Sequence, residues 1–302
     1  MGGGPEDLLG RCTFPAPGSS LVCAVSGGAD SLALLALAVT AGCGVRAVHV
    51  DHGLRPGSAD EAEVVAAAAA RLGARFTATR VEVGAGPNLE ARARAARRAV
   101  LGPDAATGHT MDDQAETVLV NLLRGAGLDG LGAMVPGRRH PILSLRRSDT
   151  AALCRSLGLQ VVRDPSNDDP RFVRNRVRHE LLPLCSAIAG RDVVPVLARQ
   201  AGVLRDEADL LELLAEGVDP TDAATLATAP RALSRRATRR WLRGTGAYAP
   251  DLAAVERVLA VARGDLGATD VAATDVAPAT NVRRSGGRMW RRQAGPAGAG
   301  VR

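Results

Sequence analysis

The sequence predicts an α/β fold in which a parallel sheet carries helices on both faces, followed by a smaller all-helical domain. In the first 185 residues, short apolar segments typical of strands alternate with longer segments of helical periodicity. Such alternation is typical of a parallel sheet. From residue 186 to about residue 265 only helical patterns occur, and residues 266–302 form a short tail rich in Ala, Gly and Thr. The expected domains are therefore 1–185 and 186–265, followed by the tail 266–302.

Each element of this fold follows from a local pattern. Strands are expected where the chain is briefly apolar or alternating, at Leu21–Val25, Val45–His49, Arg75–Val83, Ala105–Thr107, Ile142–Leu145 and Leu159–Val162. Helices are expected at Ser31–Thr40, from Ser58, from Asn88 to about Val100, at Asp113–Arg124 and at Thr150–Leu157. Ser58 opens a capping box that ends at Glu61, and Asn88 is a candidate N-cap. A small strand pair is expected around Asn281–Trp290.

Arginine supplies every basic side chain of the 302-residue chain, which has a formal net charge of +6 and a pI near 9.8. This balance favours a polyanionic partner. A GC-rich genome would give the same preference for arginine, and the two explanations carry equal weight. Aromatic residues make up only 2% of the chain, so its core must be built from Ala, Val and Leu.

Cysteine spacing and the N-terminal residues bear on the compartment. The five cysteines include no Cys-x-x-Cys pair, so we expect neither a disulfide framework nor a zinc ribbon. The longest apolar stretch, near Leu32–Ala41, is too short to span a bilayer. Glu6 and Asp7 stand where a signal peptide would be basic. The sequence therefore predicts a cytoplasmic protein without a membrane partner.

The segment Ser26-Gly27-Gly28-Ala29-Asp30-Ser31 connects the first expected strand to the first expected helix. Two glycines allow a tight turn, and their N–H groups with the following helix N-terminus form a nest for phosphate. Asp30 would repel phosphate unless a cation such as Mg²⁺ bridged them. The segment matches neither a Walker A motif nor a Rossmann motif. The alternative is an ordinary strand-to-helix turn in which Asp30 or Ser31 serves as the N-cap.

This segment resembles the PP-loop of the ATP pyrophosphatases, and four further stretches narrow the resemblance to the tRNA(Ile)-lysidine synthetase family. The stretches are HVDHGLRPGSADEA (residues 49–62), NLEARARAARR (88–98), GHTMDDQAETVLVNLLRGAGLDGLGAM (108–134) and DPSNDDPRFVRNRVRHELLPL (164–184). The resemblance covers about residues 20–185 and implies a PP-loop, adenine nucleotide α-hydrolase-like fold. Thr110 stands where the family usually has a second His, and Arg98 where it has Tyr. The extra C-terminal domain of long members is expected to be absent.

The resemblance implies an activity and two cofactors, ATP and Mg²⁺. ATP would adenylate O2 of the wobble cytidine in the CAU anticodon of tRNA(Ile), and free lysine would then displace AMP from C2 to give lysidine. Residues Ser26 to Ser31 would hold the pyrophosphate, Asp30 would bind the metal, and Asp51 and His52 would lie against the nucleotide. The partners implied are therefore tRNA(Ile) and free lysine. Homodimer formation stays open.

The acidic cluster Asp112-Asp113-Gln114-Ala115-Glu116 has two interpretations. In one, Asp113 is an N-cap and Glu116 completes a capping box. In the other, Asp112 and Glu116, which are like charges at i,i+4, bind an ammonium group of lysine. By resemblance we prefer the second, with Asp112 and Glu116 binding lysine and with His109, Asp112, Asp113 and Asp30 as catalytic residues.

Several arginines are candidates for anion binding, although a solvated helix face explains each of them equally simply. A planar guanidinium can hold a carboxylate bidentately, so Arg174 is the candidate for the lysine carboxylate. Arg94 and Arg97 are candidates for phosphate contacts, and Arg235 and Arg239 belong to a basic ridge expected to contact tRNA. Two other functions stay open: a tRNA thiolase of the same superfamily, and a nucleotide-binding module without turnover.

Overall fold

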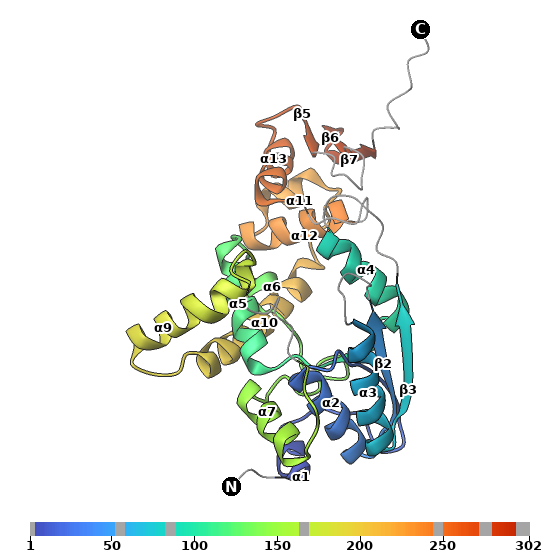
Figure 1. Cartoon of the computed structure of the whole chain (residues 1–302). Helices are drawn as coiled ribbons and strands as arrows, with labels where there is room; N and C mark the ends of the chain where they lie inside the picture. The colour runs from blue at the N-terminus through green and yellow to red at the C-terminus, as the bar shows by residue number, and fades with distance from the viewer. Residues whose placement is uncertain are drawn as a thin grey trace. The chain divides into compact units, whose positions relative to one another are not determined.

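The computed structural model describes residues 4–51, 58–81, 89–162, 169–243, 250–271 and 280–293 (Figure 1). The chain divides into two compact units, Met1–Arg205 and Asp206–Arg302. This division lies twenty residues beyond the boundary expected at residue 185. It falls within the long helix α10 (Val194–Ala215).

The first unit contains a parallel four-stranded sheet in the order β3-β2-β1-β4. Its strands are β1 (Ser20–Ala24), β2 (Gly44–Asp51), β3 (Arg75–Arg80) and β4 (Ala106–Thr107). The first four expected strands are thus confirmed. The strands expected at Ile142–Leu145 and Leu159–Val162 are wrong: residues 142–145 form turns, and residues 159–162 pair with no strand among the described residues. Both are short apolar runs that are buried by packing, and periodicity alone does not distinguish such runs from strands.

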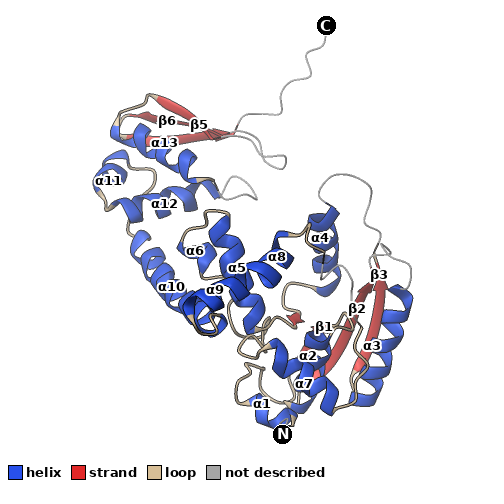
Figure 2. Cartoon of the chain, turned by 60° about the vertical axis from the view of Figure 1, so that its left-hand side comes forward, coloured by secondary structure: helices blue, strands red, loops and turns tan. Residues whose placement is uncertain are grey.

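Helices connect the strands and cover the sheet (Figure 2). The helices of this unit are α1 (Pro5–Leu9), α2 (Ala29–Thr40), α3 (Ser58–Leu72), α4 (Leu89–Leu101), α5 (Met111–Leu123), α6 (Leu128–Leu131), α7 (Arg147–Ser156), α8 (Val173–Arg176), the π-helical turn η2 (Val177–Leu181) and α9 (Leu182–Ala189). The chain steps in one direction from β1 to β3 and then returns past β1 to β4. Right-handed crossovers therefore place α2 and α3 on one face and α4 on the other.

Helix α2 is the centre of the first hydrophobic core. Every residue from Ser31 to Ala38 is buried, and Leu32, Leu34, Leu35 and Leu37 are fully so. A helix that is apolar all round belongs inside a layered fold. The core that surrounds it consists of Ala, Val, Leu, Ile and Cys side chains, which confirms the expectation from the scarcity of aromatic residues. The polar ends of this buried scaffold lie where β1 and β4 meet α2 and α5.

The second unit is not all-helical. It contains α11 (Ala223–Thr228), α12 (Arg231–Arg243) and α13 (Leu252–Arg263), and also an antiparallel sheet in the order β5-β6-β7, formed by Ala268–Val271, Thr280–Ser285 and Arg288–Gln293. The strand pair expected around Asn281–Trp290 is present and has a third strand beside it. The sheet forms because Val282 and Met289 are buried against the helices.

Among the described residues, no single helix is both long enough and apolar enough to cross a membrane. One bent pair, Val173–Ala189 with Val194–Ala215, meets these criteria of length and composition only when its two halves are taken together.

Candidate active site

The loop between β1 and α2 is built around Gly27 and two serines. Gly27 has a φ of +80°, a conformation that other residues rarely adopt, and a Cβ atom there would lie 3.0 Å from Val162 Cγ2. The Ser31 hydroxyl accepts a hydrogen bond from the Ser26 backbone N–H at 3.1 Å and donates to the Gly28 carbonyl at 2.9 Å. Ser31 therefore closes the loop on itself.

Gly28 is the N-cap of α2, in extended conformation and without a side-chain cap. The first N–H groups of α2 therefore receive no acceptor from a capping side chain, which is the arrangement that binds phosphate at a helix N-terminus. The interpretation of Asp30 or Ser31 as the N-cap is wrong, because both residues lie inside the helix.

Gly108 allows the β4–α5 connection to approach this loop. A Cβ atom at Gly108 would lie 2.6 Å from the Asp30 carbonyl oxygen and 2.8 Å from the Ser31 nitrogen. Both are backbone atoms at the start of α2, so no side chain fits without moving that helix. The residues after β4 are thereby held against the loop after β1, at the point where the strand order reverses and ligands bind in open α/β sheets.

Asp30 lies beside the N-terminus of α7. Its carboxylate accepts a hydrogen bond from the Thr150 hydroxyl, and Arg147 Nε lies 3.5 Å from its Oδ2. The pKa of Asp30 is raised above its ordinary value, chiefly by burial and also by the charge of Asp113, while Thr150 and Arg147 act to lower it. Within the described residues, no three His, Cys, Asp or Glu side chains gather as a ready-made metal site. A Mg²⁺ ion would therefore take Asp30 together with phosphate and water oxygens, which suits its usual coordination in nucleotide sites.

Glu116 is fully buried and is surrounded by three guanidinium groups. Its Oε1 accepts hydrogen bonds from Arg178 Nε at 2.7 Å and from Arg147 at 3.1 Å, and its Oε2 from Arg174 Nε at 2.8 Å and from Arg178 at 3.2 Å. Arg174 and Arg178 reach it together because they stand four residues apart across α8 and η2. The carboxylate has its full set of charged partners within the protein.

Asp113 belongs to the N-terminus of α5, but not as its N-cap. Thr110 is the N-cap, and Asp113 closes the capping box by accepting the Thr110 N–H at 2.8 Å. The capping box expected between Asp113 and Glu116 is therefore wrong. The other oxygen of Asp113 lies 3.0 Å from both Arg147 and Arg174. Burial acts to raise the pKa of Asp113, but these two arginines and the Thr110 N–H hold it below its ordinary value.

Asp112 contacts the start of α7. Its carboxylate accepts hydrogen bonds from the Arg147 backbone N–H at 2.8 Å and from two nitrogens of Arg146 at 3.1 Å. The like charges of Asp112 and Glu116 are thus compensated by arginines of the protein. The spacing of Asp112 and Glu116 therefore does not by itself require the ammonium group of a substrate to compensate their negative charges.

Arg147 connects the two halves of this site. Its guanidinium lies within 3.5 Å of Asp30 on one side and within 3.1 Å of Asp113 and Glu116 on the other. The loop after β1 and the acidic cluster after β4 therefore share one cation. A movement of Asp30 would therefore change the position of Arg147, and with it the contacts of Arg147 with Asp113 and Glu116.

His109 forms a second polar cluster with Thr107 and His140. The Thr107 hydroxyl lies 2.7 Å from His109 Nδ1 and 2.9 Å from His140 Nδ1, and the two rings meet edge to face with their centroids 5.1 Å apart. Burial lowers the pKa of His109 to about 4, and burial also lowers that of His140. Both imidazoles are therefore neutral near pH 7.

A pocket of about 590 Å³ opens beside these residues. Basic and polar side chains line it, among them Arg97, Thr107, His109, His140, Arg139 and Arg174. Its charge and size suit an anionic ligand of several heavy atoms.

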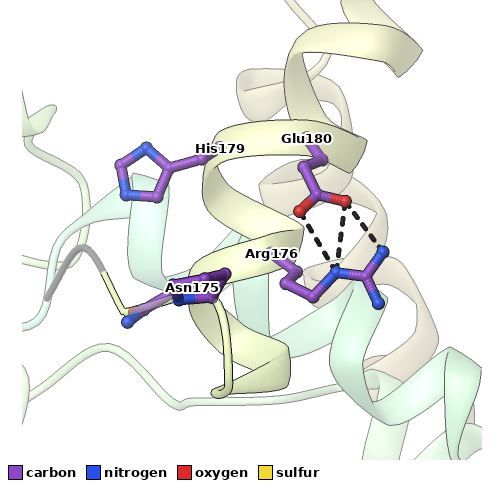
Figure 3. A pocket seen from close by; sticks show the side chains of 5 residues that line it. Asn175, Arg176, His179 and Glu180 are labelled. Atoms are coloured by element: carbon purple, nitrogen blue, oxygen red, sulfur yellow. Dashed lines mark hydrogen bonds and ion pairs between the residues drawn. The ribbon is translucent and has the colours of Figure 1, made fainter. Parts of the chain in front are cut away.

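A smaller hollow of about 130 Å³ lies beside residues of α8 and η2 (Figure 3). Arg176 donates to Glu180 in it at 2.9 and 3.2 Å, and the Asn175 amide donates to the Asp169 carbonyl at 2.9 Å. These contacts brace the segment that presents Arg174 and Arg178 to Glu116.

Comparison with known proteins assigns the family. The model of the PP-loop domain matches residues 7–185. A tRNA(Ile)-lysidine synthase of Nocardia farcinica is 43% identical over 301 residues, covering 93% of this chain and 94% of that protein. This chain belongs to the tRNA(Ile)-lysidine synthase family. Its homologues in the family include the Mycobacterium tuberculosis enzyme, which is 42% identical over 74% of this chain and 75% of that protein.

A solved structure supports the fold of this synthase family member. The U34-tRNA thiolase NcsA of Methanococcus maripaludis, described with its [4Fe-4S] cluster, superposes with a TM-score of 0.54 over 67% of this chain and 78% of that chain. The two sequences are 15% identical, so the likeness concerns the fold alone.

The remaining expected site residues of the synthase occupy different settings. Asp51 ends β2 beside β3, while His52 and the side chain of Arg94 lie outside the described residues. In the second unit, Arg235 donates to Glu256 at 2.5 Å, and the buried Nε of Arg239 has no hydrogen-bond partner among the described residues. The ridge of α12 is thus partly neutralised by acids.

Sequence reasoning missed the residues that bind the acidic cluster together. These are Arg146, Arg147, Thr150 and Arg178 around the carboxylates, and Thr107 with His140 around His109. One signal was present in the sequence: the arginine pair Arg146-Arg147 stands at the N-terminus of α7, where positive charge is unfavourable for the helix dipole unless acids lie nearby.

Proposed function

We propose that this protein ligates free lysine to C2 of the wobble cytidine in the CAU anticodon of tRNA(Ile), using ATP and releasing AMP and pyrophosphate. The observation that carries the proposal is the junction at Arg147, which joins the PP-loop residue Asp30 to the Asp113–Glu116 cluster. A nucleotide site and an amino-acid site must be adjacent if one activated intermediate serves both. The PP-loop domain implies the use of ATP.

In the first step, O2 of cytidine attacks the α-phosphorus of ATP and pyrophosphate leaves. The loop of Ser26, Gly27, Gly28, Ala29 and Ser31 would hold the pyrophosphate through its N–H groups and the N-terminus of α2. Mg²⁺ bound at Asp30 would neutralise phosphate charge. Asp51, which ends β2, and the next residue in the sequence, His52, would lie against the nucleoside. Positioning and charge neutralisation are the main contributions that such a transfer needs.

In the second step, the ε-amine of lysine attacks C2 and AMP departs. We propose that Arg174, which is 37% exposed, holds the lysine carboxylate, and that Asp112 receives the α-ammonium group. Glu116 would act by holding Arg174 in place, because its carboxylate is itself buried. The ε-ammonium must lose a proton before it attacks, and nearby carboxylates would oppose that loss. The neutral imidazole of His109 would line the reactive end, whereas Asp113, whose charge is balanced by Arg147 and Arg174, would help to hold Arg174 in place.

The tRNA would extend over further basic residues. Arg97 lines the large pocket, and Arg94, Arg235 and Arg239 are proposed phosphate contacts. A wobble base is unpaired, so it can leave its stack at modest cost. We place the reaction in the cytoplasm, which is consistent with an enzyme that modifies tRNA.

The two rival functions explain less of the site. A thiolase needs a reactive or cluster-binding cysteine, whereas burial raises the pKa of Cys23 to about 12 and that of Cys154 to about 11. A nucleotide-binding module without turnover would need the phosphate loop but not the three arginines around Glu116.

A labelling experiment tests the proposal. Purified protein is incubated with ATP, radiolabelled lysine and a tRNA(Ile) transcript bearing a CAU anticodon, and the RNA is assayed for label. We expect label that depends on ATP and on the protein. The Asp30→Ala variant should keep its fold and incorporate none. The absence of label with the wild-type protein, or equal labelling of a transcript with another wobble base, would refute the function.

A further inference from the structure

The solvent side of the β5–β6–β7 sheet carries an exposed tryptophan among arginines. In β7, the buried Met289 alternates with Arg288 and Trp290, and Trp290 is 56% exposed. The sheet register places Arg283 of β6 directly opposite Trp290. Because neighbouring residues of a strand point to opposite faces, Arg283, Arg288, Trp290 and Arg292 share one face, called here the Trp290 face.

The charges on the Trp290 face are largely uncompensated. Arg283 and Arg292 are exposed and have no ion-pair partner in the part of the chain that the structure describes. Arg288 lies 3.2 Å from Asp219, and the acid of the face, Asp270, accepts a hydrogen bond from Asn281 at 2.7 Å. Two guanidinium groups without an ion-pair partner among the described residues therefore lie on the same face as the indole ring.

The tryptophan that packs against the core of the second unit is Trp241, not Trp290. Trp241 packs against the core of the second unit, and Arg291, on the inner face of β7, lies 5.1 Å from its ring. Trp290 lies on the opposite side of the sheet and contributes little to that core. The indole of Trp290 is therefore available for contacts outside this core.

We propose that the Trp290 face binds unpaired nucleotides of RNA, with a base stacked on Trp290 and phosphates held by Arg283 and Arg292. An aromatic platform between guanidinium groups is how single-stranded nucleic acid is bound without sequence readout. Trp and Arg are also enriched at protein interfaces, but the buried centre of such an interface is largely apolar, whereas Trp290 shares this face with arginines, Asn281 and Asp270. The inference rests on the proposed function only in taking tRNA(Ile) as the natural ligand.

Binding measurements on the whole protein test the face. The probes are a 12-nucleotide single-stranded RNA, the same sequence as a duplex, and the tRNA(Ile) transcript. Trp290→Ala should weaken binding of the single strand by about 5- to 100-fold, and Trp290→Phe should retain most of it, since a phenyl ring still stacks. RNA should quench Trp290 fluorescence in the wild type. The double variant Arg283→Ala/Arg292→Ala should flatten the slope of log affinity against log salt by about 1.4 for a single strand.

Matched variants on α13 give the controls. Leu252→Ala truncates an apolar side chain of similar exposure. Arg257→Ala/Arg263→Ala removes two positive charges from outside the sheet, and Arg263 is paired with Asp265 at 2.9 Å. Equal weakening by these controls would overturn the proposal, as would equal competition by duplex and single strand. A change in oligomeric state in Trp290→Ala would also overturn it, because the face would then join copies of this chain.

Activity separates this inference from the proposed function. With tRNA in excess, Trp290→Ala should form lysidine at the wild-type rate, while its KM for tRNA rises. If the wild-type protein forms no lysidine, the proposed function fails, and the RNA-binding measurements still decide the role of the face.

Discussion

Replacing Glu116 by Gln removes one charge and almost no volume from the centre of the site. The carboxylate is fully buried and accepts four hydrogen bonds from Arg147, Arg174 and Arg178. Breaking a buried ion pair by neutralising one partner costs about 3–5 kcal/mol. The three guanidinium groups are 30%, 37% and 23% exposed and retain Asp113 nearby, so the lower value, about 3 kcal/mol, applies. For a unit of this size, that corresponds to a fall in Tm of about 6–12 °C.

Thermal unfolding and lysine kinetics measure the two consequences of Glu116→Gln. The variant should unfold earlier and show a raised KM for lysine, because Arg174 loses its anchor. The matched control is Glu180→Gln, whose carboxylate forms an exposed i,i+4 pair with Arg176 and should change stability by less than about 0.5 kcal/mol. Equal Tm values for the two variants would refute the account of Glu116 as the centre of the cluster.

Three further predictions follow from single residues. Gly108→Ala should lower stability by about 1–3 kcal/mol and weaken ATP binding, since its Cβ would meet the backbone of the PP-loop helix. The control Gly202→Ala, in open space within α10, should be neutral or stabilising. If the two variants change stability equally, the clash at Gly108 is contradicted. Burial holds the pKa of His109 at about 4, below its unfolded value. The free energy of unfolding should therefore fall by on the order of 3 kcal/mol as the pH drops from about 6.5 to about 4. His109→Asn should remove this contribution to the pH dependence, measured by denaturant titration at several pH values. Arg174→Ala should raise the KM for lysine about ten- to a hundredfold while lysine-independent adenylation of the tRNA survives; loss of adenylation as well would assign Arg174 to ATP or to the fold.

Local patterns in the sequence were sufficient for the sheet and its loop. The first four strands and the glycine turn at Gly27 and Gly28 are each defined by short-range pattern, and the structure has them at the expected places. The two later strands were not predictable in this way, because an apolar run such as Ile142–Leu145 is buried whether or not it pairs.

The partners of the acidic cluster depend on contacts between distant segments. Arg147 and Arg178 lie more than thirty and sixty residues from Glu116 in the chain, and no spacing rule links them. Sequence reasoning therefore identified the acids and Arg174, but it expected a substrate ammonium to compensate the negative charge of the acids. In the structure, arginines from distant segments of the chain compensate that charge. The N-cap of α5 was misplaced for a local reason: Thr110 and Asp113 are both favoured N-cap residues, Asp more strongly than Thr, so local preference pointed to Asp113, whereas the structure has Thr110 at the N-cap and Asp113 at the third helical position.

The nucleotide product, measured together with lysine incorporation, tests the central claim most directly. ATP labelled in the α-phosphate is incubated with the protein, lysine and the CAU transcript, and nucleotides are separated by chromatography while lysine in the RNA is counted. The account predicts one AMP for each lysine incorporated, with release of pyrophosphate. ADP as the main product, or AMP formed without lysine entering the RNA, would contradict it.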